Sequence, residues 1–251
     1  MLQKDVMKNL SSDFLPPIWH SRFFIRRTIF KAVSAFATDA KGLLLDFGCG
    51  SKPYKTLFNQ VTEYIGVDYE NPGHDHQNEQ IDIFYDGKNI PLSEGKFDYV
   101  MATEVFEHVF NLPELLIELN RVLKVNGQLF FTCPFVWVEH EVPYDYARYT
   151  QFALKHELEK AGFEIVYFKK GGDFRTALAQ LVTAYWADFM SIKTDVLIQK
   201  LPFFKSIRFI FDFIQSIIIS ILNIIGLFKI TIFPSKKDMY LSNIVLAKKI
   251  K

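Results

Sequence analysis

Short apolar runs recur along the chain from residue 43 onward and alternate with longer amphipathic stretches. An apolar run of four to eight residues is typical of a buried strand, and apolar residues at every third and fourth position predict a helix. Alternating strands and helices favour a mostly parallel sheet that helices cover on both faces. The strands are predicted at residues 43–47, 64–68, 81–84, 97–102, 128–133 and 164–168, and the clearest helices at 113–124 and 151–161.

The two ends of the chain have a different pattern. Residues 1–42 start polar and become helix-like, whereas residues 174–233 are helix-like and strongly apolar. The apolar character is greatest at residues 213–228, which contain no charged side chain. We therefore expect an N-terminal helical cap (1–42), a sheet domain (43–172 and 239–251) and an apolar helical insertion (173–238).

Composition narrows the classes of protein that fit. The formal net charge of +1 gives no global electrostatic reason to expect a nucleic-acid partner. The chain has two cysteines and no Cys/His cluster, so the sequence predicts neither a disulfide framework nor a metal site, and favours a reducing compartment. Charged residues interrupt the first 30 positions, which argues against a secretory signal and for a cytoplasmic protein.

Two glycines, Gly48 and Gly50, directly follow the first predicted strand in "LLLDFGCG". In open α/β sheets, ligands bind beyond the carboxyl ends of the strands. A dinucleotide fingerprint needs a third glycine where this chain has Pro53, and the Gly-Lys-Ser/Thr of a phosphate-binding loop is absent. Asp46, just before the first glycine, would repel a phosphate and attract a cation or an amine. The pattern therefore predicts a ligand without a pyrophosphate.

Two further acids follow the next strands. Asp68 stands 20 residues after Gly48, where a carboxylate can accept hydrogen bonds from ribose hydroxyls. Asp86 ends the next unit and could accept from the exocyclic amine of adenine, with Asp82 as a nearby rival. A ligand with an amine, a ribose and an adenine but no phosphate describes S-adenosylmethionine.

Six segments carry a family resemblance: "LLLDFGCG", "YIGVD", "DGKNIPLSEGKFDYV", "ATEVFEHV", "ELNRVLKVNGQLFFTCP" and "KAGFEIV". Through them the chain resembles the class I S-adenosylmethionine-dependent methyltransferases, in particular the type 11 small-molecule branch, over roughly residues 40–170 and the last strand. The resemblance implies a Rossmann-like sheet of seven strands, six parallel and the last (242–249) antiparallel, beside 164–168. It also implies cofactor contacts as follows: Asp46 and the Gly48–Gly50 turn at the methionine end, Asp68 at the ribose, Asp86 at the adenine, and Glu104 and His108 on the far side. The chain departs from many members at Lys52-Pro53, where they have Gly or Ala, and this should stiffen the loop.

The acceptor is expected at residues 135–150, "FVWVEHEVPYDYARYT", which follow the fifth strand. Loops after strands carry function on this architecture, and this mixture of aromatic and polar side chains suits a sugar ring. Methyl transfer to a hydroxyl needs alignment and the loss of a proton, so we expect His140 to be the general base. Alternatively, His140 and Asp145 only order the loop, with Arg148 paired to Glu141 or Asp145. The pattern His-Glu-x-Pro-x-Asp-x-x-Arg is more loosely similar to methyltransferases associated with polysaccharide biosynthesis.

These expectations favour methyl transfer to a hydroxyl or carboxyl of a sugar, a lipid-linked glycan or a related small molecule. A rival is a methyltransferase-like scaffold protein that binds the cofactor without catalysis. A nucleic-acid methyltransferase is disfavoured, because no Asn/Asp-Pro-Pro-aromatic motif follows the fourth strand. A cationic group near the N-terminus could hold the phosphate of a nucleotide sugar, although a solvated helix face is the simpler interpretation: Arg22, Arg26, Arg27 and Lys31.

The apolar insertion is expected to meet a membrane surface. Spanning takes about 20 apolar residues, and the return of strand 242–249 to the sheet excludes an odd number of crossings. A second crossing by 174–192 is disfavoured by Arg175 and Asp188. Three roles remain for the insertion: a homodimer interface, a packed helical cap, or peripheral docking of 201–233 on a membrane. We favour docking on the inner face of the membrane. Basic residues suited to anionic headgroups flank the run: Lys200, Lys205, Arg208, Lys229, Lys236 and Lys237.

Overall fold

A computed structural model describes residues 14–69, 79–200 and 208–251 of the chain. The first seven residues of the predicted docking segment, 201–207, lie outside the described residues, as does most of the polar start of the predicted N-terminal cap. The strands are β1 (Gly42–Phe47), β2 (Val61–Tyr69), β3 (Ile83–Tyr85), β4 (Phe97–Thr103), β5 (Leu123–Pro134), β6 (Phe163–Gly171) and β7 (Ser242–Lys249). The helices are α2 (Phe23–Asp39), α3 (Leu112–Val122), α4 (Gln151–Lys160), α5 (Phe174–Lys200) and α6 (Arg208–Ile232), with short 3-10 turns η1 (Lys55–Leu57) and η3 (Phe106–His108).

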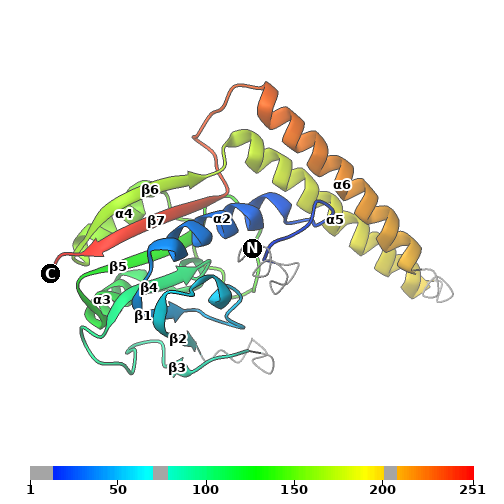
Figure 1. Ribbon diagram of the computed structural model, residues 1–251. Helices are drawn as coiled ribbons and strands as arrows, with labels where there is room; N and C mark the ends of the chain where they lie inside the picture. Colours follow the sequence, from blue (N-terminus) through cyan, green and yellow to red (C-terminus); the bar gives the residue numbers. More distant parts are fainter. Residues whose placement is uncertain (1–13, 70–78, 201–207) are drawn as a thin grey trace.

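The seven strands form one mixed sheet in the order β3-β2-β1-β4-β5-β7-β6 (Figure 1). Parallel pairing joins β3, β2, β1, β4 and β5, and β7 runs antiparallel to both of its neighbours, β5 and β6. The predicted sheet of six parallel strands and one antiparallel strand is confirmed, as is the position of 242–249 beside β6. The strand order reverses between β1 and β4, which places the glycine turn after β1 at the switch point of the sheet.

Helices cover both faces of the sheet because the side chains of the buried strands alternate between two apolar layers. In β1, Leu45 faces one layer with α3 and α4, whereas Leu44 faces the other with α2. Phe131 and Phe130 of β5 divide in the same way, and Phe130 stacks on Phe36 of α2 with ring centroids 4.5 Å apart. The N-terminal helix is therefore one of the layers that build the core.

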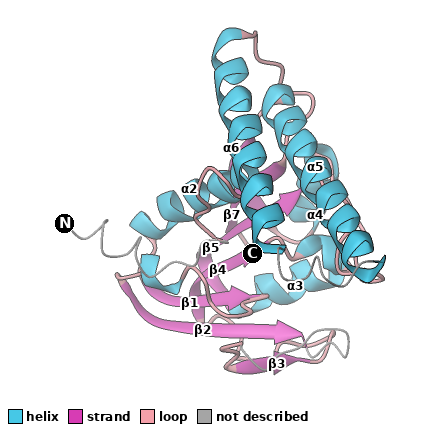
Figure 2. Cartoon of the chain, turned by 90° about the vertical axis from the view of Figure 1, so that its right-hand side faces the viewer, coloured by secondary structure: helices cyan, strands magenta, loops and turns pink. Residues whose placement is uncertain are grey.

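The apolar insertion forms a helical hairpin, in which α5 and α6 lie side by side and project beyond the sheet (Figures 1 and 2). The close approach is possible at Gly226, because a Cβ at this position would meet Cβ of Ala179 at 2.9 Å. The hairpin leaves the sheet at Gly171 and re-enters it at Ser242, and these two residues are paired across β6 and β7. The hairpin therefore connects two neighbouring antiparallel strands.

Two buried amides attach the hairpin to the segment that leads into α2. Gln180 Oε1 accepts hydrogen bonds from the backbone N–H groups of Phe24 and Ile25 at 3.0 and 3.1 Å, and its Nε2 donates to the Ser21 carbonyl. Asn223 Nδ2 donates to the Ile18 carbonyl at 2.6 Å. The first N–H groups of a helix have no intrahelical acceptor, so α5 supplies the cap that the N-terminus of α2 lacks locally.

Candidate active site

The glycine turn after β1 requires glycine for steric reasons. Gly48 has φ +72°, and a Cβ there would stand 2.3 Å from Cγ2 of Val105. Its N–H donates to the Val67 carbonyl at 2.8 Å, which ties the turn to β2. Gly66 of β2 has the matching role, because a Cβ there would lie 2.6 Å from the Cys49 sulfur. The turn thus lies against β2 at the carboxyl edge of the sheet, as the sequence predicts for a ligand-binding backbone.

A cavity of about 200 Å³ opens beside this turn, and Asp46, Gly48, Gly50 and Glu104 are among its lining residues. The Asp46 side chain accepts a hydrogen bond from the Tyr64 hydroxyl, and burial raises its pKa to about 7. A buried acid with this pKa favours a cationic group of a ligand as its partner. The four cofactor-binding predictions that concern these residues therefore converge on one cavity.

Asp68 lies beside the cavity, although it is not one of its lining residues. Its Oδ2 accepts from the Gly50 N–H at 2.7 Å, and its Oδ1 accepts from the Tyr69 N–H at 2.7 Å. The carboxylate is thus fixed at the end of β2, next to the turn. Its predicted ribose contact remains a prediction.

Asp86 is placed apart from this cavity. It directly follows β3, is exposed, and its Oδ1 accepts from the N–H groups of Lys88 and Asn89 at 2.8 Å each. These two bonds hold the pKa of its carboxyl below the usual range. Its rival Asp82 accepts from the Gly66 N–H at 2.7 Å and from Lys52 Nζ at 2.5 Å, so it orders the loop. The adenine contact of Asp86 remains a prediction.

Lys52 shows how the loop does without a third glycine. Its backbone has φ +52°, its N–H donates to the Cys49 carbonyl at 2.8 Å, and its side chain is buried. The ion pair with Asp82 crosses from the loop to the segment before β3. The expected stiffening of the loop therefore has a physical cause besides Pro53.

The cavity also has lining residues to which sequence reasoning gave no cofactor role. Arg26 of α2 is half-buried, lines the cavity and lies over the Phe14 ring at 5.3 Å. The interpretation of this cationic group as a solvated helix face is therefore wrong for Arg26, whereas Arg22 and Lys31 are exposed. The helical periodicity of 23–36 is the available signal, because Arg26 stands three residues after the buried Phe23 and three before the buried Ile29. Tyr54 and Glu79 also line the cavity.

The loop after β5 is held by an ion pair between Arg148 and Asp145. The two guanidinium nitrogens lie 2.5 and 2.6 Å from the two carboxylate oxygens, and this pairing lowers the pKa of Asp145 to about 2. Asp145 Oδ2 also accepts from the His140 backbone N–H at 3.0 Å and lies 3.3 Å from its Nδ1. Of the two partners predicted for Arg148, the structure selects Asp145 over Glu141.

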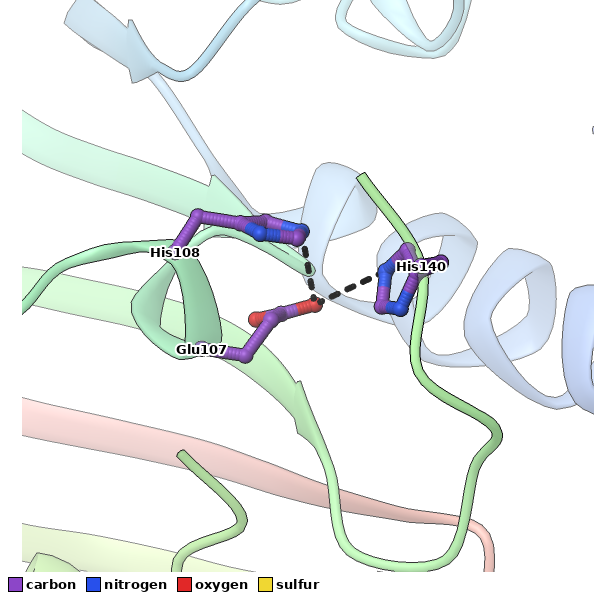
Figure 3. A group of neighbouring side chains, drawn as sticks. All are labelled: Glu107, His108 and His140. Carbon is purple, nitrogen blue, oxygen red and sulfur yellow. Dashed lines mark ion pairs between the residues drawn. The ribbon is translucent and has the colours of Figure 1, made fainter. Parts of the chain in front are cut away.

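His108 joins this loop and does not line the glycine cavity. Its Nδ1 contacts the Tyr144 carbonyl at 2.9 Å, and its ring packs edge-on against His140 with centroids 4.8 Å apart. Glu107 lies beside the two rings and points one oxygen at both: its Oε1 is 3.8 Å from His108 Nε2 and 4.0 Å from His140 Nε2 (Figure 3). Sequence reasoning missed Glu107. Its side chain is fully buried, and this burial raises its pKa well above the usual range.

Glu104 connects the two groups of residues. It has φ +54° and lines the glycine cavity, and its buried carboxylate contributes to the raised pKa of Glu107. The guanidinium groups of Arg26, from the cavity side, and Arg148, from the loop side, both lower the pKa of Glu104 against the raising effect of burial. Glu104 therefore interacts electrostatically with one residue on the cavity side and with one on the loop side.

The residues at the turn fit S-adenosylmethionine better than a phosphate ligand. The cavity wall carries the buried acid Asp46 for an amine, a glycine turn for close approach, and Asp68 alongside for hydroxyls. When bound, the cofactor supplies an electrophilic methyl group on a sulfonium.

Comparison with known proteins agrees with this chemistry. Residues 18–167 match the model of a methyltransferase domain family. Among solved structures, the [4+2]-cyclase SpnF is 16% identical, with a TM-score of 0.57 over 99% of this chain and 91% of that chain. An S-adenosylmethionine-dependent methyltransferase from Mesorhizobium loti is 13% identical, with a TM-score of 0.50 over 88% and 98%. The YcgJ protein from Bacillus subtilis is 13% identical, with a TM-score of 0.51 over 88% and 99%.

At these identities the structural likenesses show the fold alone. No curated protein sequence matches the chain. The family match covers more than half of the chain and includes β1 to β5 and most of β6. The chain therefore belongs to the methyltransferase domain family, with a Rossmann-like methyltransferase fold, and its cofactor is S-adenosylmethionine.

Proposed function

We propose that this methyltransferase transfers the methyl group to a hydroxyl, or to a carboxyl, of a sugar, a lipid-linked glycan or a related small molecule. The observation that carries the proposal is the position of the loop 135–150 beside the cavity: Glu107 Oε1 lies 4.0 Å from His140 Nε2, and Glu107 stands three residues after Glu104, which lines the cavity. The loop supplies half-buried Trp137 and Tyr144 and exposed Tyr146 beside His140. Aromatic faces with adjacent hydrogen-bonding groups suit a sugar ring, whose faces are apolar and whose edges carry hydroxyls.

The proton step is assigned to His140. Its Nδ1 faces two acceptors, the Val138 carbonyl and the Asp145 carboxylate, each at 3.3 Å, so the proton resides on Nδ1. The Nε2 lone pair is then available to accept a proton from an acceptor hydroxyl. Burial and the neighbouring His108 lower the pKa of His140, which keeps the imidazole neutral at pH 7. Alignment of the acceptor hydroxyl with the methyl group contributes more to the rate than this proton transfer does.

His140→Ala tests this assignment. We expect the variant to bind the cofactor with unchanged affinity and to lose a factor of about 10²–10⁴ in kcat, the usual contribution of a general base. His156→Ala is the matched control, because His156 is exposed on α4. Equal kcat values for His140→Ala and the parent would remove His140 from the mechanism. The mass of the product formed from candidate glycan intermediates identifies the acceptor class.

The rival function is a scaffold that binds S-adenosylmethionine without transferring its methyl group. The likeness to SpnF, a [4+2]-cyclase, favours keeping this rival, because a shared fold does not establish a shared reaction. Titration calorimetry with the cofactor, combined with detection of its demethylated product, separates the two functions. Cofactor binding without demethylated product across the acceptor panel would favour the scaffold.

The hairpin supports a lipid-linked acceptor and a place on the inner face of the membrane. In α6, residues Arg208–Phe228 are long and apolar enough to cross a membrane by length and composition. Both helices nevertheless leave large apolar side chains exposed: Val182, Tyr185, Phe189, Ile192 and Val196 on α5, and Phe213, Ile217, Ile221, Ile224 and Phe228 on α6.

Charges at the far end of the hairpin favour docking on the surface over crossing. Arg208 Nη1 lies 3.1 Å from Asp195 Oδ1, and its Nε lies 3.9 Å from Asp212 Oδ2. A hairpin that crossed the bilayer would carry these three charged groups through the hydrocarbon core, at a cost of several kcal/mol. Docking along the surface leaves the charged groups in water and buries the apolar side chains.

Flotation with anionic vesicles tests the docking. The full chain should float, and Ile217→Ser/Ile221→Ser/Ile224→Ser should remain at the bottom of the gradient. The control carries the same number of substitutions at exposed apolar positions outside the hairpin: Ile117→Ser/Phe152→Ser/Val166→Ser. A parent chain that stays at the bottom would overturn docking. Sedimentation as a dimer that the α6 variant abolishes would assign the surface to a second copy.

A further inference from the structure

We propose that Glu107, His108 and His140 bind a divalent transition-metal ion of the zinc class next to the glycine cavity. The three residues come from two separate segments, the 3-10 turn η3 after β4 and the loop after β5 (Figure 3). One ligand atom from each, a carboxylate oxygen of Glu107 and one ring nitrogen of each histidine, lies within 4.8 Å of the other two.

The spacing is close to that of a coordinated ion. Tetrahedral ligands at about 2.0–2.2 Å from zinc lie roughly 3.4 Å from one another. Glu107 Oε1 lies 3.8 Å from His108 Nε2 and 4.0 Å from His140 Nε2. These separations are too long for hydrogen bonds, and they exceed the coordinated spacing by an amount that small side-chain rotations remove.

The hydrogen bonds of both rings direct a lone pair toward Glu107. His108 Nδ1 lies 2.9 Å from the Tyr144 carbonyl, which can only accept, so Nδ1 carries the proton and Nε2 is a free donor of electrons. His140 Nδ1 faces the Val138 carbonyl and the Asp145 carboxylate, with the same consequence. Metal-bound histidines generally donate their other N–H to a carbonyl or a carboxylate in this way.

Glu107 is the second, independent sign of a ligand. Its side chain is fully buried, and among the described residues neither carboxylate oxygen has a hydrogen-bond partner. Leaving a buried carboxylate without partners is costly, and coordination to a cation is one of the few arrangements that satisfy it. The position is also well fixed, because the Glu107 carbonyl accepts from the Tyr146 N–H at 2.8 Å.

The donor set selects the class of ion. Two imidazole nitrogens and one carboxylate favour zinc and its neighbours over magnesium or calcium, which prefer oxygen ligands. A set of three protein ligands also leaves a coordination position open. Two further carboxylates are close: Glu141 Oε2 lies 3.7 Å from His108 Nε2, and Glu104 has a buried oxygen without a partner among the described residues.

The role of the ion rests on the proposed function. An open position beside the cofactor cavity would bind the acceptor hydroxyl and lower its pKa, as a Lewis acid does. With the ion bound, coordination uses the Nε2 lone pair of His140, so His140 acts as a ligand in place of its role as general base, and the acceptor proton would leave to solvent or to Glu104. Metal binding itself is measured without any acceptor, so its failure and a failure of methyl transfer are distinguishable.

The test is titration calorimetry of the chelator-treated full chain with Zn²⁺. We expect one equivalent to bind, and Glu107→Gln, His108→Ala and His140→Ala each to weaken binding at least 100-fold. Asp145→Asn should weaken it by 10- to 100-fold, as expected for a residue that orients a ligand.

A histidine control separates the site from general affinity for zinc. The variant His74→Ala/His76→Ala/His156→Ala replaces three of the six histidines and should keep the single high-affinity equivalent. Retention of the stabilisation by S-adenosylmethionine shows that the ligand variants are folded. Absence of a stoichiometric equivalent in the parent would overturn the proposal, as would unchanged binding in Glu107→Gln/His140→Ala. Displacement of Zn²⁺ by millimolar Mg²⁺ would overturn the assignment to the zinc class.

Discussion

Replacement of Gly48 by alanine probes the contact between the glycine turn and the start of η3. An L-residue in the left-handed region costs about 1–2 kcal/mol. The new Cβ would also stand 2.3 Å from Cγ2 of Val105, and overpacking of this kind costs about 1–3 kcal/mol. Gly48→Ala should therefore lower the free energy of unfolding by about 2–5 kcal/mol.

Gly95→Ala is the matched control. Gly95 has φ +62°, but no heavy atom lies within 4 Å of the position that its Cβ would take. Only the conformational cost of about 1–2 kcal/mol applies there. The difference between the two variants, about 1–3 kcal/mol, isolates the contact with Val105.

Urea unfolding followed by circular dichroism measures both values, and the slope of the transition checks that the compactness of the unfolded state is unchanged. Adding Val105→Ala to Gly48→Ala should recover part of the loss, because it removes the two methyl carbons nearest to the new Cβ. Equal destabilisation by Gly48→Ala and Gly95→Ala would refute the reasoning, since the turn would then have room for a side chain.

Three further predictions concern the cofactor, pH and the hairpin. S-adenosylmethionine should raise the melting temperature of the parent, and Asp68→Ala should abolish most of this shift, whereas nicotinamide dinucleotides should give none. The pKa of Asp46 is raised to about 7 in the folded state. Between about pH 4 and pH 7, Asp46 is therefore protonated in the folded state and ionised in the unfolded state. Stability should therefore fall by up to about 4 kcal/mol as pH rises from 4 to 7, and Asp46→Asn should flatten this dependence in urea titrations. Gln180→Leu should cost about 2–4 kcal/mol in urea unfolding, because it leaves N–H groups of α2 unsatisfied; a loss below 0.5 kcal/mol would contradict the capping role.

Local patterns predicted the sheet well because its core strands are apolar runs that end at turn residues. The hydrophobic pattern does not predict strand residues whose pairing depends on backbone hydrogen bonds alone. β2 begins at Val61 and includes the polar Thr62 and Glu63, and β5 begins at Leu123, before the predicted 128. β3 (Ile83–Tyr85) starts two residues later and ends one residue later than predicted, although the Asp82 N–H still donates to the Gly66 carbonyl of β2 at 3.0 Å.

The candidate site was predictable where one residue type determines the geometry, as at Gly48. It was not predictable where a role depends on contacts between distant segments. Nothing local distinguishes Glu107 from a solvated helix-start acid, because its burial results from the loop that closes over it nearly 40 residues later. Arg26 likewise faces the cavity only because α2 packs on the sheet beside the glycine turn.

Leu241 gives the hairpin a mechanical connection to the acceptor loop. Its carbonyl accepts from the N–H groups of Phe135 and Val136, the first residues of that loop, at 2.7 and 3.1 Å, and its own N–H donates to the Gly171 carbonyl at 2.9 Å. With 27 residues, α5 is a rigid arm roughly 40 Å long. Leu241 therefore ties the base of this arm directly to the backbone that leads to His140.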